Sequence, residues 1–275
     1  MEMQITTLSE NTASHGFLGE WGLSILVEVD GTRILMDTGM SFTATYNAQL
    51  LGIDLRNIDA IVLSHGHNDH TGGLHDVLKR KQGQVKIVAH PDLWSSKYTR
   101  SRIGEEYIGI PFTRESLEGL GAQFNLSRQS FHITENVMTT GEIPMLSGYE
   151  TIDDNLVIEH GADFISDPLA DDLALIIQTG RGLVVILGCA HHGMVNTLRH
   201  AQKLTGQQKI FAVIGGTHLY PASPERIERT IADLREMGIE KLGVSHCTGF
   251  AASSRLANAF PDAFFLNNAG MCFAL

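Results

Sequence analysis

The sequence predicts an α/β (α+β) protein, an αββα sandwich of two packed mixed sheets with helices outside. Apolar segments rich in β-branched residues alternate with helical patterns along the 275 residues. The second half of the chain repeats the order of the first in outline. Four predicted strands end in turns that carry a histidine, at His65, His191, His218 and His246. We therefore expect a single domain over residues 1–275, built of two similar halves, with an insertion at about 92–150.

The first elements form a hairpin and a helix. Residues 3–9 and 23–29 have the composition of strands, and an Asp-Gly pair at residue 30 predicts a tight turn into a third strand at 33–36. A helical pattern follows at residues 43–51. The turn after the third strand carries Asp37.

The densest polar cluster follows a buried strand at residues 58–64. It places His65, His67, Asp69 and His70 within six positions, ahead of two glycines and a helix over residues 74–81. In open α/β sheets, ligand sites form where a strand stops and a helix starts. The sequence therefore predicts the functional site at this junction.

The spacing of these side chains predicts a metal site. Side chains two apart in an extended segment point the same way, so His65 and His67 can reach one metal together. Asp69 and His70 follow as the chain turns, and they point to a second position nearby. Imidazole and carboxylate ligands suit zinc, manganese or iron. Two ions about 3.5–4 Å apart would clamp a hydroxide and a substrate oxygen.

The segment from residue 92 to 150 differs in composition from its surroundings. After a strand at 85–89 we expect short helices that shape a pocket, with short strands at 121–124 and 131–133. The guanidinium fork matches phosphate oxygens, so the basic residues here are either phosphate contacts or solvated charges. These basic residues are Lys97, Arg100, Arg102 and Arg114.

The second half again alternates strands with helices. We expect strands at 156–159, 173–177, 183–187, 210–214, 242–245 and 263–266, and helices at 194–204, 224–237 and 251–260. Three of these strands lead into turns that contain Cys189 and His191, His218, and His246 and Cys247. Convergence of these turns with the His65 turn on one edge would form a metal cleft.

Composition excludes several classes of protein. The formal charge is −11, from 20 basic and 31 acidic residues, and no basic patch suggests a nucleic-acid partner. No apolar run is long enough to cross a membrane, and no secretory signal is apparent. Three widely spaced cysteines form no disulfide framework, so we expect a cytoplasmic protein. The expected partner is a small molecule, and the sequence carries no argument about oligomers.

These motifs resemble those of a known family. His65-Gly66-His67-Asn68-Asp69-His70 resembles the signature of the metallo-β-lactamase fold superfamily. Further motifs resemble one branch, that of 7,8-dihydropterin-6-yl-methyl-4-(β-D-ribofuranosyl)aminobenzene-5′-phosphate synthase and its bacterial relatives. They are Gly22-Leu23-Ser24, Leu35-Met36-Asp37-Thr38-Gly39, Thr140-Gly141-Glu142-Ile143-Pro144, Asp171-Asp172-Leu173-Ala174-Leu175, Gly188-Cys189-Ala190-His191, Gly215-Gly216-Thr217-His218-Leu219 and Ser245-His246-Cys247-Thr248-Gly249.

The resemblance implies a binuclear centre of two divalent ions, zinc first, with manganese or iron as alternatives. The implied ligands are His65, His67 and His191 for one ion and Asp69, His70 and His246 for the other. The chain departs from the usual pattern at Cys189, which stands near the position of a bridging aspartate in many members.

Several further residues remain open as ligands or as partners of ligands. Either Cys189 or His191 could complete the site, with His192 as the next alternative. Asp171 or Asp172 could also contribute. Asp37 is implied to orient a ligating imidazole, although a carboxylate that caps the following turn is the alternative.

The resemblance also implies the function. We expect a metal-dependent hydrolase that attacks a small, phosphorylated ester through a metal-bound hydroxide, with Asp69 and His218 as the catalytic side chains. The alternative is a methanopterin-type transferase that condenses a dihydropterin methyl diphosphate with an aminobenzene riboside phosphate. A non-catalytic metal-binding module ranks last, because the signature is intact.

Overall fold

The computed structural model describes residues 2–275 and divides into two compact units. Unit 1 comprises residues 2–128, 152–171 and 268–275, and unit 2 comprises residues 129–151 and 172–267. Each unit has its own sheet and its own apolar core. That the two units form one domain of two similar halves, with an insertion at 92–150, stays a prediction.

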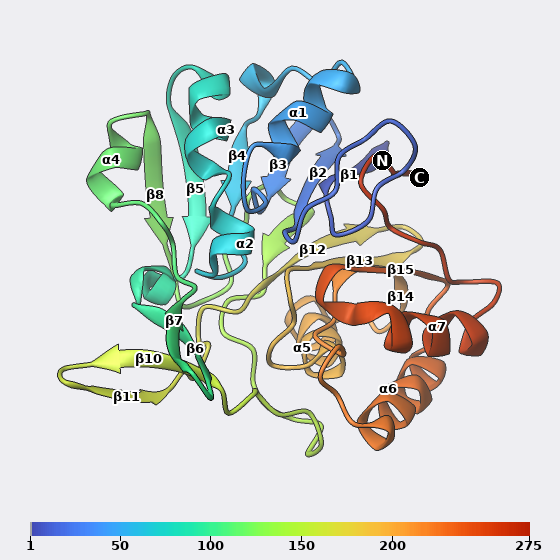
Figure 1. The fold of residues 1–275 in the computed structure, drawn as a ribbon. Coiled ribbons are helices and arrows are strands. Elements are labelled where there is room, and N and C mark those ends of the chain that lie inside the picture. The colour runs from blue at the N-terminus through green and yellow to red at the C-terminus, as the bar shows by residue number, and fades with distance from the viewer. Residues whose placement is uncertain (1) are drawn as a thin grey trace. The chain divides into compact units, whose positions relative to one another are not determined.

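A seven-stranded sheet forms the centre of unit 1, in the order β16-β1-β2-β3-β4-β5-β8 (Figure 1). The strands β16, β1, β2 and β3 are antiparallel neighbours, whereas β3, β4, β5 and β8 run parallel. The bounds are β1 Met3–Ser9, β2 Ser24–Val29, β3 Thr32–Met36, β4 Ala60–Val62, β5 Val85–Ala89, β8 Ala122–Leu126 and β16 Cys272–Ala274. The central strand β4 is apolar and buried along its whole length, as expected for a parallel strand with both faces covered.

The helices of unit 1 lie between its strands in the chain. They are α1 Thr43–Leu50, α2 Asn68–Thr71, α3 Leu74–Lys81 and α4 Arg114–Glu118, with single turns η1 Leu55–Asn57 and η2 Pro91–Trp94. The apolar side of α3 buries Leu74, Val77 and Leu78 in the same cluster as residues of β3, β4 and β5. Its last turn carries only basic residues, which suits the negative end of a helix dipole.

The inserted segment contains short helices, as expected, in α4 and most of η2, but it also contains two strands of a further sheet that were not predicted. It forms part of a four-stranded antiparallel sheet in the order β11-β10-β6-β7. The strands are β6 Lys97–Ser101, β7 Gly104–Tyr107, β10 Leu156–His160 and β11 Asp163–Ser166. The ring of Tyr98 packs edge-to-face with Tyr107 of the neighbouring strand β7 and with Phe164 of β11, and aromatic contacts between strands favour a sheet over helices.

Unit 2 contains a five-stranded sheet in the order β15-β14-β13-β12-β9. The strands are β9 Val137–Thr139, β12 Ala174–Thr179, β13 Gly182–Leu187, β14 Ile210–Gly216 and β15 Lys241–Ser245. The hairpin β12–β13 is antiparallel, and β13, β14 and β15 are parallel. The helices α5 Met194–Thr205, α6 Pro224–Met237 and α7 Gly249–Ala259 follow β13, β14 and β15, and η3 is His246–Thr248.

The core of unit 2 joins these helices to the sheet. One apolar cluster includes Val185 of β13, Leu198 of α5, Leu234 of α6 and Leu256 of α7, all with no measurable exposure. The start of α6 is capped by Ser223, whose side chain accepts the N–H of Arg226, with Pro224 at the first helical position. These caps agree with the boundaries predicted for this helix.

Two predicted strands are wrong. Residues 263–266 make only an isolated bridge between Phe264 and Leu242, because the N–H groups of Ala263 and Phe264 donate to Phe260 in a helical turn after α7. Residues 131–133 likewise make only a bridge at His132. The last strand of unit 1 is instead β16, which pairs with β1.

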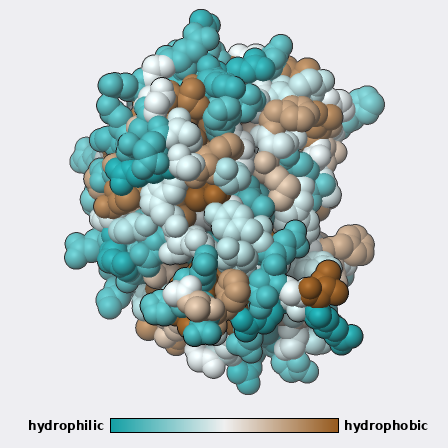
Figure 2. All heavy atoms as spheres, turned by 60° about the vertical axis from the view of Figure 1, so that its left-hand side comes forward, coloured by the Kyte–Doolittle hydropathy of each residue, from teal (hydrophilic) through white to brown (hydrophobic). Residues whose placement is uncertain are grey.

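Exposed hydrophobic residues are scattered on the face shown in Figure 2. Figure 2 shows a face covered mostly by hydrophilic and neutral side chains, with hydrophobic residues in separate spots. Among residues 2–275, every helix is too short or too polar to cross a bilayer.

Candidate metal centre

The histidine cluster of unit 1 lies directly after β4. The N–H of Leu63 still donates to Val88 O of β5, at 3.0 Å, which keeps the segment at the end of the sheet. His67 is the last extended residue and precedes α2, so His65 and His67 are presented before the helix and His70 within it. The sheet therefore fixes one end of the cluster and α2 fixes the other.

Two glycines let α2 approach the neighbouring turn closely. A Cβ at Gly73 would lie 2.0 Å from Thr38 O, and one at Gly72 would lie 2.2 Å from Met40 O. No residue with a side chain fits either position without backbone movement. The predicted glycine pair precedes a helix, as expected, and it also allows α2 to pack directly on the turn that carries Asp37.

Asp37 is the centre of a buried hydrogen-bond network. One carboxylate oxygen accepts the Ser64 N–H at 2.7 Å. The other accepts the Ser64 hydroxyl and His70 Nδ1, both at 2.7 Å. All three side chains have no measurable exposure. A carboxylate can only accept, so His70 Nδ1 carries its proton and the Nε2 lone pair is left for a metal.

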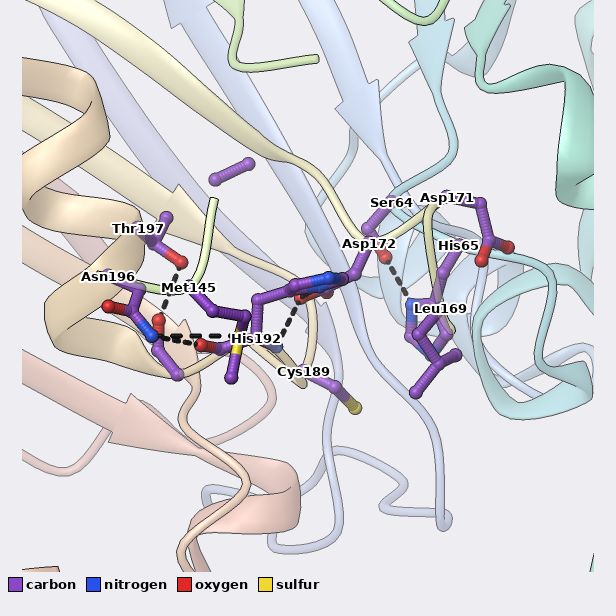
Figure 3. A network of polar contacts seen from close by, with 12 residues as sticks. Ser64, His65, Met145, Leu169, Asp171, Asp172, Cys189, His192, Asn196 and Thr197 are labelled. Carbon is purple, nitrogen blue, oxygen red and sulfur yellow. Dashed lines mark hydrogen bonds and ion pairs between the residues drawn. The ribbon is translucent and has the colours of Figure 1, made fainter. Parts of the chain in front are cut away.

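The same reasoning determines which ring nitrogen of His65 carries the proton. Figure 3 shows the Ser64 hydroxyl beside the His65 ring, with Oγ 2.9 Å from Nδ1. Because the hydroxyl proton is given to Asp37, the Ser64 oxygen accepts from His65 Nδ1. His65 Nε2 is therefore the atom with a lone pair, and it faces His67 Nδ1 at 3.0 Å.

This donor set fits a metal ion. Two imidazole nitrogens on one tetrahedral zinc lie about 3.3 Å apart, given bond lengths of about 2.0–2.1 Å. The separation of 3.0 Å between His65 Nε2 and His67 Nδ1 is close to that value. Asp69 Oδ2 lies 3.9 Å from His70 Nε2, which places a second pair of ligand atoms together. Unit 1 thus brings together four predicted ligands, with Asp37 behind them.

Lys97 and Asp171 lie behind the turn between the first two histidines. Asp171 Oδ2 accepts the N–H of Gly66 at 2.8 Å, and Asp171 Oδ1 accepts from Lys97 Nζ at 2.8 Å. Burial alone would lower the pKa of Lys97, but the charges of Asp171 and Asp167 raise it above its ordinary value. Neither alternative predicted for Lys97, a phosphate contact or a solvated charge, is found, because its ammonium group is buried between carboxylates.

Two other basic residues of the inserted segment are on the surface. Arg100 pairs with Glu105 at 3.0 Å, and Arg114 pairs with Glu118 at 2.7 Å, with all four side chains partly exposed. They match the alternative of solvated charges.

In unit 2, three parallel strands end at the same edge of the sheet. Leu187 of β13 pairs with Gly215 of β14, which pairs with Val244 of β15. The turns that follow carry Cys189 and His191, His218, and His246 and Cys247. Their predicted convergence is therefore found within unit 2.

Cys189 is at the middle of this second cluster. Its Sγ atom lies within 4.8 Å of ligand atoms of His191, His218, His246 and Cys247. The His191 and His218 rings are 4.2 Å apart between centroids. A Cβ at Gly216 would lie 2.7 Å from Cys247 Sγ, so the thiol fits only against glycine. Imidazoles and thiols in this arrangement match the ligand types of zinc.

The backbone of these turns is strained. Ala190, His218 and His246 have φ of 53°, 48° and 54°, in the left-handed region that favours glycine, and Asp37 in unit 1 has φ of 58°. Such conformations persist only where surrounding contacts determine them, and they gather at functional sites. The His218 N–H donates to Cys247 Sγ at 3.2 Å, which holds one of these turns.

Cys247 is a site residue that the sequence did not assign. Burial opposes its ionisation, but hydrogen bonds with Cys189 and His218 and the charges of His246 and His218 lower the pKa of Cys247 below its ordinary value. The only sequence signal was its position directly after His246.

Asp172 contacts His192 rather than a predicted ligand of unit 2. Asp172 Oδ2 accepts the His192 N–H at 2.9 Å and lies 3.4 Å from His192 Nδ1, as Figure 3 shows. The His192 carbonyl in turn accepts from Asn196 Nδ2 at 2.7 Å. Asp172 therefore fixes the turn that begins α5, which also carries His191.

Comparison with known proteins identifies the family and agrees with this fold. A profile described as the Metallo-beta-lactamase superfamily matches residues 22–202. The chain belongs to this superfamily, which confirms the predicted family and fold class. The protein is an enzyme, of the hydrolase or the transferase-like kind.

Three of the proteins found match over nearly the whole chain. The chain is 33% identical to the 7,8-dihydropterin-6-methyl-4-(beta-D-ribofuranosyl)-aminobenzene-5'-phosphate synthase of Methanocaldococcus jannaschii, covering 98% of this chain and 95% of that one. The crystal structure of Tm1679, described as a metal-dependent hydrolase of the beta-lactamase superfamily, has a TM-score of 0.86 at 28% identity, with 99% of each chain covered. The YhfI protein of Bacillus subtilis has a TM-score of 0.61 at 13% identity over 100% of both chains, a likeness of fold alone.

Proposed function

We propose that this enzyme is a metal-dependent hydrolase that acts on a small phosphorylated ester. The observation that carries the proposal is the ligand geometry of unit 1, where His65 Nε2 and His67 Nδ1 face each other at 3.0 Å and Asp37 orients His70. The description of Tm1679 as a metal-dependent hydrolase supports the same reaction class. The phosphate in the product name of the M. jannaschii synthase supports a phosphorylated substrate.

The proposed cofactor is a pair of divalent ions, zinc first, with manganese or iron as alternatives. The proposed ligands are His65, His67 and His191 for one ion and Asp69, His70 and His246 for the other. Superfamily membership and the donor chemistry of each cluster support this assignment. When bound, the ions would lower the pKa of a water to about 7 and stabilise negative charge on oxygen.

The side chains around the ligands have separate roles in this proposal. Asp37 and Ser64 keep the protons of His70 and His65 on Nδ1, so that Nε2 of each ring can bind a metal. Asp69 orients the attacking water. His218 donates a hydrogen bond or a proton to the oxygen that leaves. None of the cysteines Cys189, Cys247 and Cys272 forms a disulfide in the part of the chain that the structure describes, which supports a reducing, cytoplasmic setting.

A transferase is the second candidate, and the whole-chain likeness to a synthase favours it. The substrates would be a dihydropterin methyl diphosphate and an aminobenzene riboside phosphate. The same ligands would then stabilise the departing diphosphate instead of activating water.

Elemental analysis and a substrate panel test the function. We expect about two equivalents of metal and metal-dependent hydrolysis of a chromogenic phosphodiester or phosphomonoester. A lactone substrate serves as the control for acyl chemistry. Diphosphate release from a pterin methyl diphosphate only in the presence of the riboside phosphate would assign the transferase. Failure to take up metal on reconstitution would contradict the whole proposal.

Cobalt substitution tests whether Cys189 is a ligand. If Cys189 rather than His191 completes the site, the cobalt-loaded protein will show a sulfur-to-cobalt charge-transfer band, because a coordinating thiol is deprotonated. Cys189→Ser should abolish the band. Cys272→Ser, which removes an exposed thiol on β16, should leave it unchanged. A band that persists in Cys189→Ser would rule out Cys189 as its source.

A further inference from the structure

A buried ionic cluster in unit 1 joins the inserted sheet to the metal-binding turn. Lys97 begins β6, and its Nζ lies 2.8 Å from Asp167 Oδ2 and 2.8 Å from Asp171 Oδ1. The three residues are 1%, 4% and 1% exposed. Burying a cation with two carboxylates costs desolvation energy that hydrophobic residues of similar size avoid. Stability alone therefore does not explain this cluster.

Asp171 connects this cluster to the histidines. Its second oxygen accepts the N–H of Gly66 at 2.8 Å. Gly66 is the residue between His65 and His67, so the carboxylate holds the peptide that separates two predicted ligands. The two ends of this hydrogen bond are 105 residues apart in the sequence.

The fit around Gly66 leaves little room for movement. A Cβ at this position would lie 2.5 Å from Leu93 O and 3.2 Å from Lys97 Cε. The backbone of Gly66 thus packs directly on η2 and on the stem of Lys97, while Asp171 holds its N–H from another direction. The turn is confined by contacts that involve no metal.

Asp167 has a different set of contacts. It shares Lys97 with Asp171, but its other oxygen accepts the N–H of Leu169 at 2.7 Å. Leu169 has φ of 48°, so Asp167 stabilises a strained turn that leads to Asp171. Among its described hydrogen bonds none reaches residues 65–67. Asp167 is therefore a matched control for Asp171, because it is also a buried carboxylate that pairs with Lys97.

We propose that Asp171, held in place by Lys97, is a positioning residue for the metal centre. By fixing the Gly66 peptide it keeps His65 and His67 in ligating geometry before a metal binds. This inference rests on the proposed function, since it takes the two histidines as ligands. It assigns the inserted sheet, through Lys97, a part in metal affinity rather than in phosphate binding.

Isosteric amides separate positioning from stability. Gly66 and Lys97 donate to different oxygens of Asp171, and an amide has only one oxygen, so Asn at 171 cannot keep both hydrogen bonds in place. We expect Asp171→Asn to weaken zinc affinity of the full-length protein, measured by chelator competition, by about 10–100-fold. Asp167→Asn should change zinc affinity by less than about 3-fold. Its unfolding temperature should nevertheless fall about as much as that of Asp171→Asn. Equal affinity losses in the two variants would indicate a merely structural cluster and overturn the inference.

Hydrogen exchange on the wild-type protein provides a test that needs no variant. The Gly66 amide should be as protected in the zinc-free protein as in the zinc-loaded one, because Asp171 accepts it in both. Rapid exchange in the zinc-free protein would contradict preorganisation. A wild-type protein that takes up no zinc would refute the proposed function, whereas tight zinc binding by Asp171→Asn would refute this inference alone.

Discussion

Asp37→Ala is expected to lower the free energy of unfolding by about 3–5 kcal/mol, the largest stability effect that the site predicts. The carboxylate of Asp37 is fully buried and accepts from Ser64 N, Ser64 Oγ and His70 Nδ1. Alanine would leave these donors without their acceptor in a site closed to water. Urea unfolding followed by circular dichroism measures the change.

The asparagine variant tests the cause of that loss. Asp37→Asn keeps the volume but places an NH₂ group where an acceptor is needed, so we expect a loss of about 1–3 kcal/mol and a His70 ring that no longer holds its proton on Nδ1. Asp59→Asn is the control, since Asp59 also accepts a backbone N–H, from Arg33 at 2.8 Å, but at an exposed position. The free energy of unfolding of Asp59→Asn should fall by less than about 1 kcal/mol. Similar losses at the two positions would show that Asp37 has no special role.

Local pattern was sufficient to predict most of the elements that present the site. The spacing of His65, His67 and His70 after an apolar strand predicted a junction that the structure places between β4 and α2. Parallel strands with their carboxyl ends at one edge predicted the unit 2 cluster. Both inferences use the fixed geometry of strands, which the sequence pattern reveals directly.

Contacts between distant segments could not be predicted in the same way. The bond from Gly66 to Asp171 depends on how the inserted sheet folds back, and the sequence suggested short helices for part of that segment. Lysine is a residue type that usually lies at the surface, and Lys97 can be buried because two carboxylates pair with it. Residues 263–266 have strand composition, yet their backbone donors serve a helical turn. In each case tertiary contacts override local preference.

His65→Ala is expected to have the largest effect on function. Removing His65 leaves His67 Nδ1 without the nitrogen that faces it at 3.0 Å, so one ion of the pair would lose a ligand. We expect metal content to fall by about one equivalent and turnover of the panel substrate to fall by more than about 100-fold. Elemental analysis and steady-state kinetics on the same preparation measure both quantities.

His75→Ala is the matched control for that variant. His75 lies on α3 in the same unit, where its ring stacks on Phe112 with centroids 5.4 Å apart, and none of its described contacts reaches the ligand cluster. This variant should keep full metal content and full turnover even if its unfolding temperature drops. Loss of activity in His65→Ala with unchanged metal content would place His65 in contact with substrate instead. Full activity without metal would remove the basis for a metal-dependent reaction, because no other buried group in the proposal activates water.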